Sequence, residues 1–224
     1  LQHNSCSSLP ASMPLKDTQN EPDDRQIAID RVGVKALRYP MQIRDKAREI
    51  QHTIATAALT VDLPHHFKGT HMSRLIEVLD QHSAEFTQRT LPILLHDVHR
   101  RLGTDDARIV VAFPYFLPRS APVTGATALM DYACQFHARL TKDGLQFTVQ
   151  VAVPVTSVCP CSKAISDYGA HNQRGTITIS VSLQRRGGEF DLIWIEDLIA
   201  IAEASASSPV YPLLKRADER HVTM

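Results

Sequence analysis

Hydrophobic and polar positions alternate along much of this chain, a pattern typical of β-strands with one buried face. The clearest run ends at Leu183, with every second residue apolar, and Asp143-Gly144 is a strong hairpin-turn signal between two other runs. The charged segment 44–49 separates the first two runs, which predicts a long antiparallel hairpin. The predicted strands lie at 27–34, 53–63, 107–117, 126–140, 145–155 and 176–183.

Two segments instead repeat apolar residues every three or four positions, as helices do. The first helix is expected at 71–86, with Thr70 as its N-cap. The second contains Pro92 near its start and ends at Gly103. A third helix is expected at 196–206. The order strand, strand, helix, helix, strand, strand predicts an α+β fold with paired helices covering one face of an antiparallel sheet.

Composition narrows the class of protein. The chain has 24 Lys and Arg residues and 24 Asp and Glu residues, so it has no excess of positive charge that would indicate nucleic-acid binding. Four cysteines without a signal-peptide pattern do not form a disulfide framework, which favours the cytoplasm. Charges interrupt every apolar run, so no membrane span is expected. Residues 1–26 have little periodicity and are expected to form a flexible arm.

A polar island, formed by residues 154–163 and 168–175, has the highest density of side chains that can bind a metal or take part in catalysis. Thiol and imidazole groups are ligands that zinc prefers, and Gly169 would let the chain fold back between Cys159 and His171. Cys159 and Cys161 would face the same way in an extended segment. A structural zinc, buried thiols and a catalytic metal all remain open on this spacing. The neighbouring donors Asn172, Gln173 and Arg174 favour a polar, anionic ligand.

A second group of cations surrounds the expected start of the first helix. His71 and Arg74 lie one turn apart, and Lys68 comes just before them. Unpaired N–H groups at a helix N-terminus attract anions, which suggests a phosphate site. An ordinary solvated helix start is an equally good explanation. Further phosphate candidates are Lys163, Arg174, Lys215 and Arg216.

The island closely resembles the signature of GTP cyclohydrolase IB, through Cys159-Pro160-Cys161-Ser162-Lys163 and Tyr168-Gly169-Ala170-His171-Asn172-Gln173-Arg174-Gly175. Other stretches similar to that family occur in family order from about residue 25 to the last residue. They include Leu37-Arg38-Tyr39-Pro40, Phe67-Lys68-Gly69-Thr70-His71-Met72-Ser73-Arg74, Ala121-Pro122-Val123, Asp131-Tyr132 and Leu213-Leu214-Lys215-Arg216.

The resemblance implies the tunnelling fold, with tandem units at 27–122 and 123–224. It also implies a homo-oligomer, a tetramer with active sites between subunits. The family continues beyond the position of Met224 with further site residues, so the second unit is expected to be incomplete here and residues to be missing from the given sequence.

The resemblance further implies that Cys159 and His171 are catalytic residues that bind a divalent metal with Glu219. Zinc is the expected metal, and manganese or iron are alternatives. Ala217 stands where the family usually has proline before the Asp-Glu pair. Cys161 is expected to pack beside the site or to support its ligands, with direct ligation of the metal as the alternative. Lys68, His71, Arg74, Lys163 and Arg174 are the expected substrate-binding residues.

The implied reaction is hydrolysis of GTP at C8, with release of formate and formation of 7,8-dihydroneopterin triphosphate. A divalent cation promotes such chemistry by lowering the pKa of water. Two alternatives remain. One is a related enzyme acting on another purine or deazapurine, with Cys159 as nucleophile. The other is a non-catalytic interaction domain stabilised by zinc.

Overall fold

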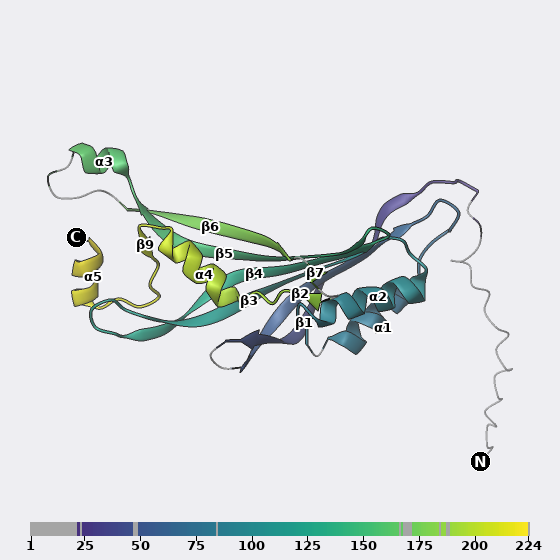
Figure 1. Ribbon diagram of the computed structural model, residues 1–224, viewed down its shortest axis with the longest axis horizontal. Helices are drawn as coiled ribbons and strands as arrows, with labels where there is room; N and C mark the ends of the chain where they lie inside the picture. The colour runs from purple at the N-terminus through teal and green to yellow at the C-terminus, as the bar shows by residue number, and fades with distance from the viewer. Residues whose placement is uncertain are drawn as a thin grey trace, which may run out of the picture.

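The computed structural model describes residues 22, 24–46, 49–83, 85–165, 167, 172–183, 185–186 and 189–223. It is an α+β protein built on a large antiparallel sheet with the strand order β1-β2-β3-β4-β5-β6 and a short strand, β9, beside β5 (Figure 1); β7 and β8 pair separately. The long strands are β1 Ile29–Asp45, β2 Glu49–Leu63, β3 Ala107–Ser120, β4 Thr127–Thr141, β5 Gly144–Val158 and β6 Asn172–Leu183. The short strands are β7 Arg185–Arg186, β8 Glu189–Phe190 and β9 Ser208–Pro209. The helices are α1 Met72–His82, α2 Thr90–Leu102, α3 Pro160–Ile165, α4 Ile195–Ala204 and α5 Arg216–Thr223.

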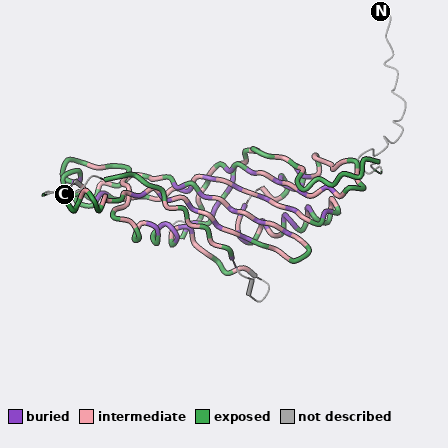
Figure 2. Tube along the Cα trace, turned by 90° about the horizontal axis from the view of Figure 1, so that it is seen from above, coloured by how far each residue is buried: buried purple, intermediate pink, exposed green. Residues whose placement is uncertain are grey.

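The alternating sequence pattern produces a sheet with one covered face. Buried and half-exposed residues alternate along β3, β4 and β5, as the purple and pink segments of Figure 2 show. The register brings apolar side chains together across strands, for example Val111 opposite Phe136 and Phe136 opposite Val149. Cross-strand pairs of this kind stabilise a sheet, and here they join the helices in one core.

The helices bury the apolar stripes that the sequence predicts. Residues three and four positions apart share a helix face, so α1 buries Leu75, Val78 and Leu79 against the core. Gly103 ends α2 in the left-handed conformation, with φ of 66°, and its N–H donates to the carbonyl of His99 at 2.9 Å. Gly144, with φ of 124°, lies in the predicted β4–β5 turn. No helix among the described residues is both long and apolar enough to cross a membrane.

Several predicted boundaries need correction. Thr70 is not the N-cap of α1; His71 occupies that position and makes no side-chain capping bond. The helix ends at His82 and not near Phe86, because Ser83 turns back and its hydroxyl donates to the carbonyl of Asp80. The charged segment 44–49 does not separate the strands over its whole length, since β1 extends to Asp45 and β2 begins at residue 49. Helices α3 and α5 were not predicted.

The sheet divides into two arms at one end. Pairing between β4 and β5 stops at Ala133 and Ala152, whereas β3 and β4 stay paired as far as Ser120 and Thr127. Beyond the division, β9 takes the place of β4 beside β5, with Pro209 opposite Val155. The predicted boundary between units at 122/123 lies in the β3–β4 turn and stays a prediction. Of the predicted N-terminal arm, residues 1–21 and 23 lie outside the described residues.

Candidate functional site: a cleft at the divided end of the sheet

A cleft of about 340 Å³ lies at the divided end of the sheet. The ends of β5 and β6 form one side, and the chain from β9 to α5 forms the other. Its polar lining includes Asn172 and Arg174 from β6, Tyr211 from the connecting segment, and His221 from α5. Small-molecule sites are concave and carry a few polar groups that orient the ligand, and this cleft has both properties.

Cys159 adjoins this cleft through its neighbour in the chain and is not itself among the lining residues. It directly follows Val158, which lines the cleft and ends β5, and it comes just before α3. The Cys159 side chain is half-buried, and its Sγ accepts a hydrogen bond from the N–H of Ser162 at 3.5 Å. Cys161 is exposed on α3. The predicted extended geometry, with both thiols facing one site, is therefore wrong, because the chain turns into a helix after Cys159.

His171 lies outside the described residues, so its predicted role stays a prediction. The strand pairing still bears on it, because Val158 lies directly opposite Asn172. The chain therefore leaves the sheet just before Cys159 and rejoins it just after His171 at neighbouring points.

Glu219 lies on α5, and its side chain is exposed. The same helix borders the cleft through His221 and Val222. The segments that carry Cys159 and Glu219 thus border one cleft from two sides. Thiolate and carboxylate are suitable ligands for zinc, so the chemistry of this donor pair fits a divalent cation. Within the described part of the chain, no group of three or more His, Cys, Asp or Glu side chains converges on a metal position.

Asp218 is a functional candidate that the sequence reasoning missed. Its carboxylate is fully buried, and burial raises its pKa. Hydrogen bonds from the Thr124 hydroxyl and from the N–H groups of Thr124, Lys215 and Val123 outweigh that effect and hold the pKa well below its usual range. The only sequence signal is that Asp218 is an acid in the first turn of α5. Acids are common at this position because they interact favourably with the helix dipole.

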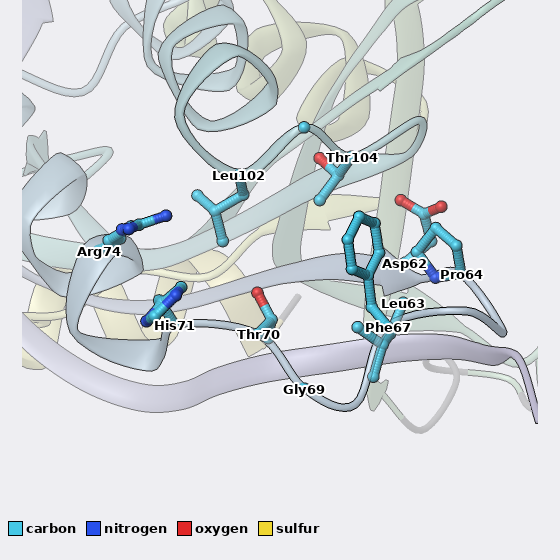
Figure 3. Close-up of a pocket in the computed structure, with 11 residues that line it drawn as sticks. Asp62, Leu63, Pro64, Phe67, Gly69, Thr70, His71, Arg74, Leu102 and Thr104 are labelled. Atoms are coloured by element: carbon cyan, nitrogen blue, oxygen red, sulfur yellow. The ribbon is translucent and has the colours of Figure 1, made fainter. Parts of the chain in front are cut away.

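The predicted basic cluster lies at the opposite end of the sheet. His71 and Arg74 line a small cavity of about 30 Å³ beside the end of β2, together with Phe67 and Thr104 (Figure 3). The N–H of Arg74 donates to the carbonyl of His71 at 3.1 Å. Lys68 is exposed near this cavity but does not line it. The structure thus brings His71 and Arg74 together, as expected.

One chain does not bring the two groups of predicted residues together. Strand pairing aligns the end of β2 with Leu145, whereas Arg174 lies opposite Thr156 near the other end of β5. Leu145 and Thr156 are eleven positions apart along β5, which corresponds to roughly 35 Å. Figure 1 shows the same separation, with α1 and α2 at one end and α3 and α5 at the other. Lys163 is exposed on α3, at the cleft end.

Fold and site together define an α+β protein with a polar cleft bordered by a thiol-bearing segment and a carboxylate-bearing helix. Comparison with known proteins identifies the group more closely. The sequence profile described as type I GTP cyclohydrolase FolE2 matches residues 15–224. The chain belongs to this family.

Individual relatives are similar over most of the chain. A GTP cyclohydrolase FolE2 of Nitrosococcus oceani is 48% identical over 210 residues, which are 94% of this chain and 76% of that protein. One from Methylobacillus flagellatus is 46% identical over 96% of this chain and 78% of its own length. A third, from Syntrophus aciditrophicus, is 48% identical over 92% of this chain and 79% of its own length.

Proposed function

We propose that this protein is a GTP cyclohydrolase of type IB that acts in folate biosynthesis. The observation that carries the proposal is family membership, with identities of 46–48% to relatives named GTP cyclohydrolase FolE2 over more than nine-tenths of the chain. The cleft at the divided end of the sheet supports it, because the end of β5 that leads to Cys159 and helix α5 both line that cleft.

The reaction consumes GTP and water. Hydrolysis opens the imidazole ring of the base at C8 and releases that carbon as formate. The remaining atoms close again to give 7,8-dihydroneopterin triphosphate, a precursor of pterins and folates. The triphosphate does not react, so basic side chains near it contribute binding and orientation.

Cys159, His171 and Glu219 are the residues that would hold a divalent cation beside the cleft. Zinc fits the thiol and carboxylate donors best, and manganese or iron are alternatives. When bound, such a cation would supply Lewis-acid activation of water. The chain itself supplies polar groups to the cleft, and Arg174, which lines it, would meet an anionic part of the substrate.

The separation of roughly 35 Å between Arg174 and the basic cluster leads to a proposal about assembly. If Lys68, His71 and Arg74 bind the phosphates of the GTP that reacts near Cys159, they must come from another copy of the chain. We therefore propose a homo-oligomer, a tetramer with sites shared between subunits. Tandem tunnelling-fold units at 27–122 and 123–224 are part of the same proposal.

The direct test is incubation of the purified full chain with GTP. Equimolar formate and a fluorescent pterin after oxidation are expected, and chelation of divalent metal should stop both. GTP left intact by a folded, metal-loaded protein would refute the proposed activity.

Shared sites have a test of their own. Cys159→Ala and Arg74→Ala should each be inactive, but unfolding and refolding a mixture of the two should restore part of the activity. Mixed oligomers would contain some sites that receive an intact residue from each chain. Mixed oligomers with no recovered activity would refute sites that combine Arg74 and Cys159 from different copies.

A further inference from the structure

Helix α5 is attached to the rest of the protein by a carboxylate. Asp218 Oδ1 accepts hydrogen bonds from the N–H groups of Val123 and Thr124, both at 2.9 Å. Asp218 Oδ2 accepts from the Thr124 hydroxyl at 2.6 Å and from the N–H of Lys215 at 2.9 Å. Three of these four donors belong to the β3–β4 turn, more than ninety positions earlier in the sequence.

An apolar face does not provide this attachment. Among the α5 residues whose burial is described, Asp218 alone is buried, and Val222 is partly exposed. A helix of eight residues is too short to be stable by itself in water, so its position depends on its contacts. The bond to Lys215 also caps the first turn, as an acid at the third helical position commonly does.

We propose that Asp218 is a positioning residue for Glu219, because it fixes α5, which borders the cleft through His221 and Val222, and with it the direction of the Glu219 carboxylate. This inference rests on the proposed function, in which Glu219 binds the divalent cation. Successive helical residues point about 100° apart around the axis. With Asp218 directed into the β3–β4 turn, Glu219 is left on an exposed side of the same helix, and its own N–H donates to the carbonyl of Lys215 at 2.9 Å.

Asp218 acts through Glu219 and not as a ligand itself. Both of its oxygens already accept two hydrogen bonds each, and the side chain has no exposed surface. Residues that orient a metal ligand commonly change metal affinity or activity by about 10–100-fold when they are replaced. The positioning role therefore predicts a large effect on metal affinity from a residue that does not touch the metal.

The test uses the full chain with zinc or manganese, and measures metal affinity by chelator competition and amide hydrogen exchange in 216–223. Asp218→Asn should bind metal at least about tenfold more weakly and exchange α5 amides faster. Thr124→Val removes the hydroxyl donor, and with it a long hydrogen bond of 3.4 Å from the N–H of Ala126, but keeps the backbone donors to Asp218, so it should give a smaller shift in the same direction. Thr124→Ser keeps that donor and should restore wild-type values. Asp143→Asn, in the exposed β4–β5 turn, is the matched control and should change neither quantity.

Glu219→Gln separates failure of this inference from failure of the proposed site. Loss of metal in Glu219→Gln and in Asp218→Asn, with core amides still protected, supports positioning. If Glu219→Gln loses the metal but Asp218→Asn and Thr124→Val bind it with wild-type affinity, the inference is overturned and the proposed site stays intact. Wild-type affinity in Glu219→Gln overturns the proposed ligand, and the inference with it. If Asp218→Asn does not fold, the comparison of Thr124→Val with Thr124→Ser decides.

Discussion

The guanidinium of Arg119 donates two hydrogen bonds to the carboxylate of Glu203, both 2.8 Å long. Arg119 lies on β3 and Glu203 on α4, so this pair joins the helix to the arm that carries the β3–β4 turn. Tyr132 completes the group, because its hydroxyl accepts from Arg119 and donates to Glu203. The side chains of Arg119 and Glu203 are only 27% and 15% exposed, so water screens their interaction weakly.

Replacing Glu203 by Gln should therefore lower the free energy of unfolding by about 1.5–3 kcal/mol, the range for hydrogen bonds to charged groups. Denaturant titration measures this. Lys142→Gln is the control, since the ion pair of Lys142 with Asp105 is exposed and such pairs contribute little. Equal stability of Glu203→Gln and wild type would show that the pair does not hold α4 in place.

Cys159→Ala should lower the metal content and abolish formate release, yet leave the fold nearly unchanged. The reason is that Cys159 is half-buried at the end of β5, outside the apolar core. Metal analysis, a formate assay and circular dichroism give the three readouts. Loss of the fold would instead indicate a structural metal, because metal binding and folding would then be coupled. Unchanged metal content with a trapped substrate adduct on the wild type would indicate a nucleophilic thiol.

Arg74→Ala should weaken binding of GTP much more than binding of guanosine. A charge-assisted contact contributes roughly 1.5–3 kcal/mol, which corresponds to about 10–100-fold in affinity. Isothermal titration with both ligands measures the difference. Arg89→Ala is a matched control, because Arg89 is exposed at the start of α2 and its side chain has no ion pair within the described structure. Equal losses for GTP and guanosine would remove Arg74 from the phosphate site.

Because of Asp106, the free energy of unfolding should depend on pH in the acidic range. Hydrogen bonds from the Arg139 side chain hold the pKa of Asp106 below its usual range, and the charges of Arg139, Arg108 and Arg31 act in the same direction. Because the folded state lowers this pKa, the stabilisation is present above the unfolded value of about 3.9 and is lost as the pH falls further. Asp106→Asn should thus be less stable than wild type at neutral pH, and the gap should narrow below about pH 4. A gap that stays constant in denaturant titrations from pH 7 to pH 3 would contradict this.

The sequence by itself determined the strands, the main helices and the cysteine motif. Alternation with a period of two encodes which face of a strand is buried, and spacing of three and four does the same for a helix, so both signals are local. Asp143-Gly144 fixed a hairpin for the same reason, because turn geometry depends on a few neighbouring residues. The motif around Cys159 could be recognised because its residues are close together in the chain.

Only the tertiary structure decided where α5 lies and which predicted residues share a cleft. The burial of Asp218 depends on donors more than ninety positions away, and no local pattern distinguishes it from the solvated acid beside it. The separation of Arg74 from Arg174 likewise follows from the length and register of the strands between them. Long-range pairing sets these distances, because residues far apart in sequence meet only when the whole sheet has formed.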